Sequence, residues 1–203
     1  SHEIVGVAGV ANSGQKELCE VIAGLAKAEK GRIFFEGDNL VGKTPRDIIR
    51  LGIRMGFIPE DRLGMGLVGS MDIVHNLILK DYQNQPGIIL RRGPCVKKAN
   101  KIVKELDIQT PDIYTPVKKL SGGNVQKVVV GREFDYEPDL LIMNQPTRGI
   151  DVGAIEFIRK KIVDMRSRKK AILLVSADLS EILSLSDTIL VMHEAASSDI
   201  SPM

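Results

Sequence analysis

The chain has few cysteines: only Cys19 and Cys95 occur among its 203 residues. Their spacing matches no metal-binding pattern and gives no disulfide framework, which is typical of proteins of a reducing cytosol. No apolar run is long enough to cross a bilayer, and no signal peptide is visible. If the protein serves a membrane, we therefore expect it to do so as a peripheral subunit.

The chain also lacks a strong net charge. Its 28 Lys and Arg residues nearly balance 26 Asp and Glu residues, for a formal charge of +2. Because basic and acidic residues are interspersed, the composition argues against an extended nucleic-acid surface. With 43% hydrophobic and 27% charged residues, the sequence is that of a globular protein, either one large domain or two small lobes.

The most informative stretch is residues 120–127, Leu-Ser-Gly-Gly-Asn-Val-Gln-Lys. Ser121, Gly122 and Gly123 precede a helix that we predict over residues 124–134. Such a helix start offers unpaired N–H groups, a hydroxyl and the positive end of the helix dipole, with no Cβ in the way. It suits an anionic oxygen, although an ordinary serine N-cap followed by a flexible loop has the same local sequence.

A second pattern of this kind lies near the start of the chain. A strand predicted at residues 3–8 is followed by a glycine-rich loop and a helix at residues 17–25, the plan of the phosphate-binding loop G-x-x-x-x-G-K-[ST]. Gly9 and Gly14 keep the glycine spacing, but Gln15 stands at the lysine position and Lys16 at the Ser/Thr position. Taken alone, the loop would be read as a plain strand-to-helix turn.

Strands and helices alternate along the rest of the chain. The predicted strands are residues 53–58, 139–143, 171–175 and 188–192, with a short hairpin at residues 31–38. The predicted helices are residues 44–51, 152–167 and 178–185, and residues 71–80 and 94–106 joined by a linker at 83–93. This alternation predicts an α/β fold, with a mainly parallel sheet flanked by helices on both faces.

The order of these motifs resembles the ATP-binding cassette (ABC) ATPases of membrane transporters. Leu-Ser-Gly-Gly-x-Gln, a helix, a buried strand and then Asn144-Gln145-Pro146-Thr147 follow one another as in that family, and the resemblance covers residues 3–193. It implies a P-loop NTPase fold with a nucleotide-binding core and an inserted helical lobe. The core would be residues 1–62 and 120–193, the lobe that contacts the permease would be residues 63–119, and residues 194–203 would lie outside the fold.

Cassettes of this family begin with further strands before the position of Glu3. The resemblance therefore leads us to expect that the chain is an excised fragment and that its first two residues are left over from a cleaved tag. It also assigns positions. The degenerate P-loop would comprise Gly9, Asn12, Ser13, Gly14, Gln15, Lys16 and Glu17. The signature would comprise Leu120, Ser121, Gly122, Gly123, Asn124 and Gln126. The Q-loop position would be Glu60, and the D-loop would contain Gly149, Ile150 and Asp151.

Judged by that resemblance, the hydrolytic groups are missing. A working site needs a lysine on the phosphates, a hydroxyl and an Asp to hold Mg²⁺, and a group that orients water. Gln15 and Lys16 replace the first two, Asn144 and Gln145 replace the Asp and the following Glu, and Ala177 replaces a later histidine. Amides keep the shape of carboxylates but lose metal affinity and basicity. We therefore expect no metal site and an isolated chain that is inactive or very weakly active.

The signature, by contrast, is intact. In ABC proteins two cassettes pair head to tail, and each ATP lies between one P-loop and the other cassette's signature. An intact signature beside a degenerate P-loop is similar to the C-terminal cassette of the double-cassette subunits that power simple-sugar and nucleoside importers. Pro-Glu-Asp-Arg at residues 59–62 and Pro-Thr-Arg-Gly-Ile-Asp at residues 146–151 carry the same resemblance. Gln145 favours the nucleoside branch, and the solute stays open.

This resemblance implies ATP as the ligand, bound weakly or without Mg²⁺ at the chain's own site, where Lys16 would supply part of the metal's charge. Mg²⁺ would act at the partner cassette's site. The implied partners are an N-terminal cassette of the same polypeptide, permease subunits and indirectly a solute-binding protein, at the cytoplasmic face of the membrane. Two alternatives remain open: a self-sufficient P-loop NTPase or kinase that uses Lys16, and a soluble ABC protein of translation or DNA repair.

Overall fold

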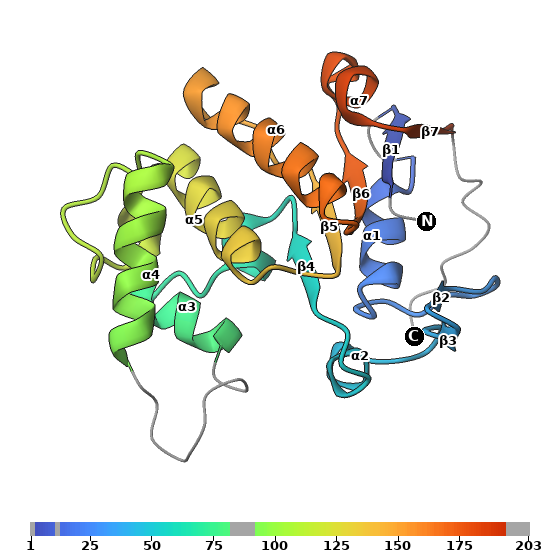
Figure 1. Cartoon of the computed structure of the whole chain (residues 1–203), viewed down its shortest axis with the longest axis horizontal. Coiled ribbons are helices and arrows are strands. Elements are labelled where there is room, and N and C mark those ends of the chain that lie inside the picture. The colour runs from blue at the N-terminus through green and yellow to red at the C-terminus, as the bar shows by residue number, and fades with distance from the viewer. Residues whose placement is uncertain (1–2, 11–12, 82–91, 194–203) are drawn as a thin grey trace.

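A five-stranded sheet forms the centre of the computed structural model, which describes residues 3–10, 13–81 and 92–193 (Figure 1). Its order is β4-β5-β6-β1-β7, and every neighbouring pair is parallel, which confirms the predicted fold class. The strands are β1 (Ile4–Gly9), β4 (Met55–Ile58), β5 (Leu140–Asn144), β6 (Ala171–Val175) and β7 (Thr188–Met192).

The strand bounds follow the apolar runs of the sequence. β5 and β6 are buried along nearly their whole length, because helices cover both faces of a parallel sheet. The strand predicted at residues 53–58 begins instead at Met55, since Ile53 packs into a separate small cluster with Leu40 and Ile48. Residues 171–175 and 188–192 form strands with the predicted bounds.

Helices cover the sheet unequally. Cys19 of α1 (Gln15–Ile22) packs with Val7 and Ile142 on one face, where burial raises the pKa of its thiol to about 12. The other face carries α5 (Gly122–Asp135), α6 (Val152–Ser167) and α7 (Leu179–Leu185), whose apolar residues join the main core cluster. Ser121, Asp151 and Asp178 cap these three helices through side-chain oxygens, as the sequence predicts for residues of this type.

The inserted segment packs onto α5. Its helices are α3 (Ile73–Asp81) and α4 (Arg92–Glu105), and their buried residues belong to the same core cluster as the sheet. Glu133 of α5 is fully buried and binds both parts: it accepts hydrogen bonds from Phe57 N–H at 3.1 Å and Lys80 Nζ at 2.8 Å. The predicted linker at residues 83–93 and the tail at residues 194–203 lie largely or wholly outside the described residues.

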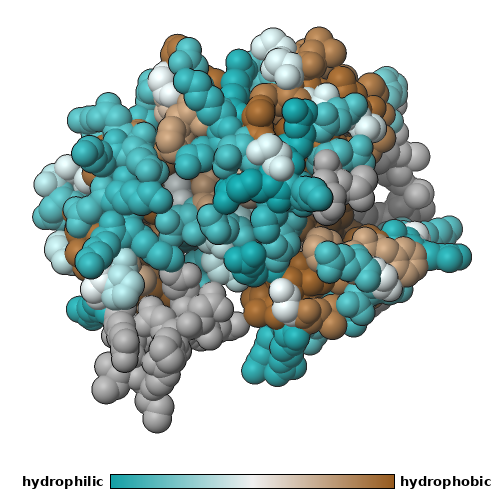
Figure 2. All heavy atoms as spheres, in the orientation of Figure 1, coloured by the Kyte–Doolittle hydropathy of each residue, from teal (hydrophilic) through white to brown (hydrophobic). Residues whose placement is uncertain are grey.

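Small elements complete the fold. β2 (Phe34–Phe35) and β3 (Asp38–Asn39) form the predicted hairpin, and α2 (Pro45–Arg50) begins at a Thr44–Asp47 capping box. Short helical turns occur at η1 (Arg62–Gly66) and η3 (Val117–Lys119). Figure 2 shows hydrophobic residues at the surface near α7 and near α2, whereas polar residues dominate over α4 to α6. None of the described helices combines the length and apolar character that a membrane crossing needs.

Candidate functional site

A groove opens at the carboxyl ends of the parallel strands, where α/β sheets bind their ligands. It consists of two adjoining cavities of about 710 and 480 Å³, which share the residues Lys16, Glu60, Asn144 and Arg148. Eight residues that the sequence singles out line it: Gly9, Gln15, Lys16, Glu17, Glu60, Asn144, Gln145 and Ala177. Asn12 lies outside the described residues. The structure therefore brings the degenerate positions together in one concave site.

The loop between β1 and α1 is closed by its own side chain. Gln15 folds back: its Nε2 donates to the Val10 carbonyl at 2.9 Å, and its Oε1 accepts from the Ser13 N–H at 3.0 Å. A Cβ on Gly9 would lie 2.5 Å from Gln15 Nε2, so the amide lies directly against the base of the loop. The Ser13 N–H, which in a phosphate-binding loop would face an anion, is therefore already satisfied within the chain.

Gly14 makes this turn possible. It is the N-cap of α1 and has a φ of 92°, in the left-handed region that suits glycine. The next residue but one, Lys16, keeps an exposed side chain in the wall of both cavities, with Nζ 3.8 Å from Glu20 Oε1. A pair of this kind at the surface contributes little, so the Lys16 ammonium can turn toward an anion in the groove.

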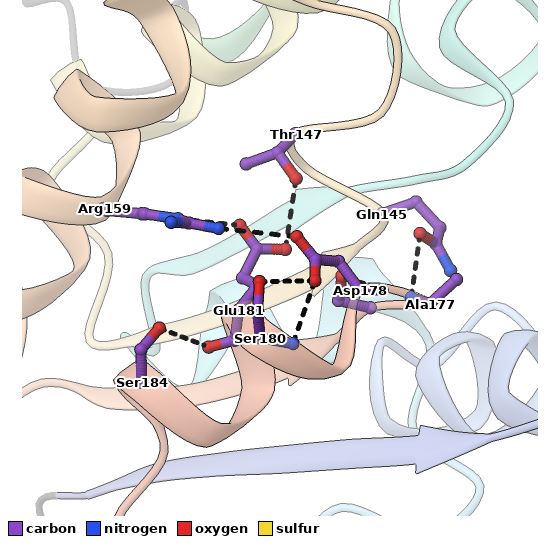
Figure 3. A network of polar contacts seen from close by, with 9 residues as sticks. Gln145, Thr147, Arg159, Ala177, Asp178, Ser180, Glu181 and Ser184 are labelled. Atoms are coloured by element: carbon purple, nitrogen blue, oxygen red, sulfur yellow. Dashed lines mark hydrogen bonds and ion pairs between the residues drawn. The ribbon is translucent and has the colours of Figure 1, made fainter. Parts of the chain in front are cut away.

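Gln145 ties the end of β5 to the end of β6. Its N–H donates to the Val175 carbonyl at 2.9 Å, and its side-chain Oε1 accepts from the Ala177 N–H at 3.2 Å (Figure 3). Gln145 has a φ of 56°, and the preceding Asn144 is buried. The two amides thus lie together at the end of β5, and the side chain of Gln145 is used for an internal hydrogen bond.

A buried carboxylate on α7, which the sequence did not single out, contacts the segment that follows β5. Glu181 is fully buried; it accepts from the Thr147 hydroxyl at 3.1 Å, and its other oxygen lies 3.8 Å from Arg159 Nε (Figure 3). Arg159 also reaches Asp178 at 3.5 Å. A hydrogen bond from the Ser180 hydroxyl, with further help from backbone N–H groups, lowers the pKa of Asp178. The only sequence signal for Glu181 is its place three residues after the helix cap Asp178.

The signature lies outside the groove. Among the described residues that line the two cavities, none belongs to the signature (residues 120–126). The Ser121 side chain is exposed, and its oxygen accepts from Asn124 N at 3.4 Å and from Asn124 Nδ2 at 2.9 Å. Because both bonds use oxygen lone pairs, the hydroxyl hydrogen stays available to donate to a group outside the chain.

The signature packs closely on the D-loop (residues 148–151). A Cβ on Gly123 would lie 2.9 Å from the Gly149 carbonyl oxygen, so only glycine allows this approach. Gln126, which is buried, donates to the Pro146 carbonyl at 2.9 Å. Lys127, also buried, contacts Asp151 at 2.6 Å, and this bond, together with the Ala154 N–H, lowers the pKa of Asp151.

Metal ligands are not assembled in the described part of the chain: no group of three or more His, Cys, Asp or Glu side chains comes together there. Of the acids that line the groove, Glu60 forms an ion pair with Arg148. Asp178, after β6, lies 3.5 Å from Arg159, and the donors at the end of β5 are the amides Asn144 and Gln145, which do not fit the carboxylate preference of Mg²⁺.

A family model described as "ABC transporter" matches residues 1–148. The chain is 48% identical over 195 residues to the guanosine import ATP-binding protein NupO of Bacillus subtilis, covering 95% of this chain and 38% of that protein. It is 43% identical to the glucose import ATP-binding protein TsgD13 of Haloferax volcanii, covering 95% of this chain and 36% of that protein. The chain thus spans well under half the length of these relatives.

Solved structures agree in fold. The dimeric structure of a bacterial ABC transporter cassette matches with a TM-score of 0.82 at 18% identity, covering 95% of this chain and 82% of that one. A nucleotide-free ATP-binding cassette from an ABC transporter matches with a TM-score of 0.71 at 23% identity, covering 96% of this chain and 79% of that one. At these identities the likeness concerns the arrangement of the elements alone.

Proposed function

The chain belongs to the ABC transporter family of ATP-binding cassettes, and from this premise we propose that it is the degenerate, C-terminal cassette of a sugar or nucleoside importer subunit. In this role it completes an ATP site in trans by presenting its signature to the P-loop of a partner cassette. Its match to only 38% of the guanosine import protein is compatible with a second cassette in a protein of that length.

One contrast carries the proposal. The groove that would hold the chain's own nucleotide has lost its catalytic groups, and Gln15 occupies the anion-binding N–H of Ser13. The signature, in contrast, is complete, lies outside that groove and exposes a serine hydroxyl with a proton to donate. A chain that had simply lost its function would have no physical reason to keep the second feature while losing the first.

The chain's own groove then binds nucleotide weakly. Lys16 lines it and offers positive charge to phosphates, whereas the Arg148 side chain is paired with Glu60. Asn144 and Gln145 offer no ligand of the kind Mg²⁺ prefers. We therefore assign no catalytic step to this groove. Mg²⁺ would belong to the partner cassette's site, where it would polarise the phosphate that Ser121 contacts.

The proposed role also implies the partners. They are an N-terminal cassette of the same polypeptide, permease subunits against the helical lobe (residues 63–119), and indirectly a solute-binding protein. The core would be residues 1–62 and 120–193, and the assembly would lie at the cytoplasmic face of the membrane. The relatives are named for guanosine and for glucose import, so the solute class stays at sugars or nucleosides.

Replacement of Ser121 tests the proposal in the complete ATP-binding subunit assembled with its permease. Ser121→Arg removes one hydroxyl donor and adds bulk at the γ-phosphate, so we expect ATP turnover to fall by about a hundredfold or more. Ser167→Arg adds the same charge and bulk at an exposed serine of α6 and should leave turnover unchanged. Wild-type turnover in the Ser121→Arg assembly would refute the trans role.

A further inference from the structure

Arg62 sits at the start of a helical turn that is fixed to α5. Asp61 caps η1 by accepting from the Gly64 N–H at 2.8 Å. Gly66, at the other end of the turn, lies against Val129 of α5, where an added Cβ would be 3.2 Å from a methyl group. The backbone from which the Arg62 side chain leaves is therefore held in place relative to the signature helix.

The Arg62 guanidinium bridges two motifs that are far apart in the sequence. Nη1 donates to the Gly122 carbonyl of the signature at 2.7 Å, and Nη2 donates to the Arg148 carbonyl of the D-loop. Both glycines beside it leave room: a Cβ would lie 3.2 Å from Nη1 at Gly122 and 3.6 Å from Nη2 at Gly149. A planar guanidinium supplies two such donors in a fixed relative orientation, which an ammonium does not.

Two further contacts join the same segments. Glu60 forms an ion pair with the Arg148 side chain, so residues 60–62 hold Arg148 both through its side chain and through its carbonyl. Gly123 approaches the Gly149 carbonyl so closely that a Cβ would lie 2.9 Å away. The loop after β4, the signature and the D-loop therefore converge, with Arg62 donating to both of the others.

We propose that Arg62 is a positioning residue that fixes the spacing between the signature and the D-loop, so that both form a single surface toward the partner cassette. The inference rests on the proposed function, because only a chain that acts in trans needs the signature and the D-loop at a fixed distance from each other. Arg62 lines the smaller cavity of the groove, but its Nη1 and Nη2 donate to backbone carbonyls. It acts through Gly122 and Arg148, and displacement of the loop after β4 displaces both segments together.

Amide hydrogen exchange of this chain tests the positioning directly. In Arg62→Ala and Arg62→Lys we expect exchange to rise about tenfold at residues 120–124 and at residues 148–151 together, because the local opening loses a charge-assisted bond on each side. Arg46→Ala, at an exposed arginine of α2, should leave both segments unchanged. Unchanged exchange in the Arg62 variants, or a rise in only one segment, would overturn the proposal.

Turnover in the complete subunit with its permease separates positioning from mere stability. We expect Arg62→Ala to lower kcat about tenfold, since misplacement of groups around a phosphate costs rate, with the KM for ATP within about twofold of wild type. Arg62→Lys should not restore kcat. If Ser121→Arg fails to inactivate, the proposed function itself fails. If Ser121→Arg inactivates but Arg62→Ala turns over like wild type, only the role of Arg62 is refuted.

Discussion

At the scale of single residues, Gln15 and Lys16 play different parts at the start of α1. Gln15 satisfies the loop's own N–H and carbonyl, whereas Lys16 keeps its ammonium exposed in the groove wall. The substitution at Gln15 was readable from the sequence, but its consequence was not. The fold-back depends on the left-handed turn at Gly14 and on a rotamer, which a motif comparison does not specify.

Removal of the Gln15 amide should improve anion binding. In Gln15→Ala the Ser13 N–H loses its side-chain acceptor and keeps only the 3.2 Å bond to the Val10 carbonyl, which it can exchange for a phosphate oxygen. One net hydrogen bond to phosphate corresponds to ATP binding about fivefold tighter than in wild type. Calorimetric titration of ATP into the two proteins measures the difference. Equal or weaker binding by Gln15→Ala would mean that the glutamine amide helps to hold the nucleotide.

Lys16 should carry the metal-independent part of binding. Because Asn144 and Gln145 offer amides in place of carboxylates, chelation of Mg²⁺ should leave the ATP affinity of this chain nearly unchanged. Lys16→Ala should weaken it about tenfold through the loss of one charge-assisted contact. Lys30→Ala, at an exposed lysine outside the groove, provides the control. Binding that requires Mg²⁺ strictly would contradict this role.

At the scale of elements, capping residues explain where sequence prediction succeeds. Asp151 caps α6, and both the helix and the following strand β6 have the bounds that the sequence predicts. Contacts between elements distant in sequence were not predictable. Arg62 reaches Gly122 across 60 positions and Arg148 across 86, and such bridges depend on how the loops meet in space. The contacts of Glu133 with Phe57 and Lys80 were not predictable either, because Glu133 lies among the apolar residues of α5 and nothing in the sequence marks its partners.

Glu133 should hold the inserted helices to the sheet in a pH-dependent way. Burial alone would raise its pKa, but Lys80 and Arg132, with hydrogen bonds from Lys80 and the Phe57 N–H, lower it below the ordinary value of 4.5. A lowered pKa in the folded state means that the stabilisation is present above pH 4.5 and is lost as the pH falls through the folded-state pKa.

Glu133→Gln should therefore lower the free energy of unfolding by about 3 kcal/mol at pH 7, because it leaves two cations without their buried carboxylate. The difference from wild type should shrink as the pH falls below 4.5, because there the unfolded state binds a proton that the folded state takes up only at its lower pKa. Urea denaturation at several pH values measures both effects. Glu105→Gln, at an exposed glutamate of α4, serves as the control, and a difference that does not change with pH would count against the ion network.

At the scale of the whole molecule, the proposed function makes one side of the cassette degenerate and the other complete. In the proposed function ATP would pair two cassettes by lying between a P-loop and a signature, so two copies of this chain would not form two competent sites. We expect the chain to sediment as a monomer with or without ATP. An ATP-dependent homodimer in sedimentation velocity would show that the groove around Gln15 still supports pairing.

Four of the positions that the motifs single out lie together, because parallel strands bring their carboxyl ends to one edge wherever the strands lie in the sequence. Gln15, Glu60, Asn144 and Ala177 indeed line the same cavity. The motifs themselves predict a degenerate nucleotide site beside an intact signature. The structure adds that no described lining residue of the groove belongs to the signature and that Gln15 bonds internally to Ser13 and Val10.

Steady-state ATP turnover by the purified chain alone, with Mg²⁺, tests the central claim most directly. Asn144 and Gln145 place amides at the end of β5, and the nearby carboxylates Glu60 and Asp178 are paired with Arg148 and Arg159. The account therefore predicts no turnover above background at any ATP concentration. Mg²⁺-dependent turnover on the order of 1 s⁻¹, abolished by Lys16→Ala, would identify a self-sufficient NTPase and contradict it.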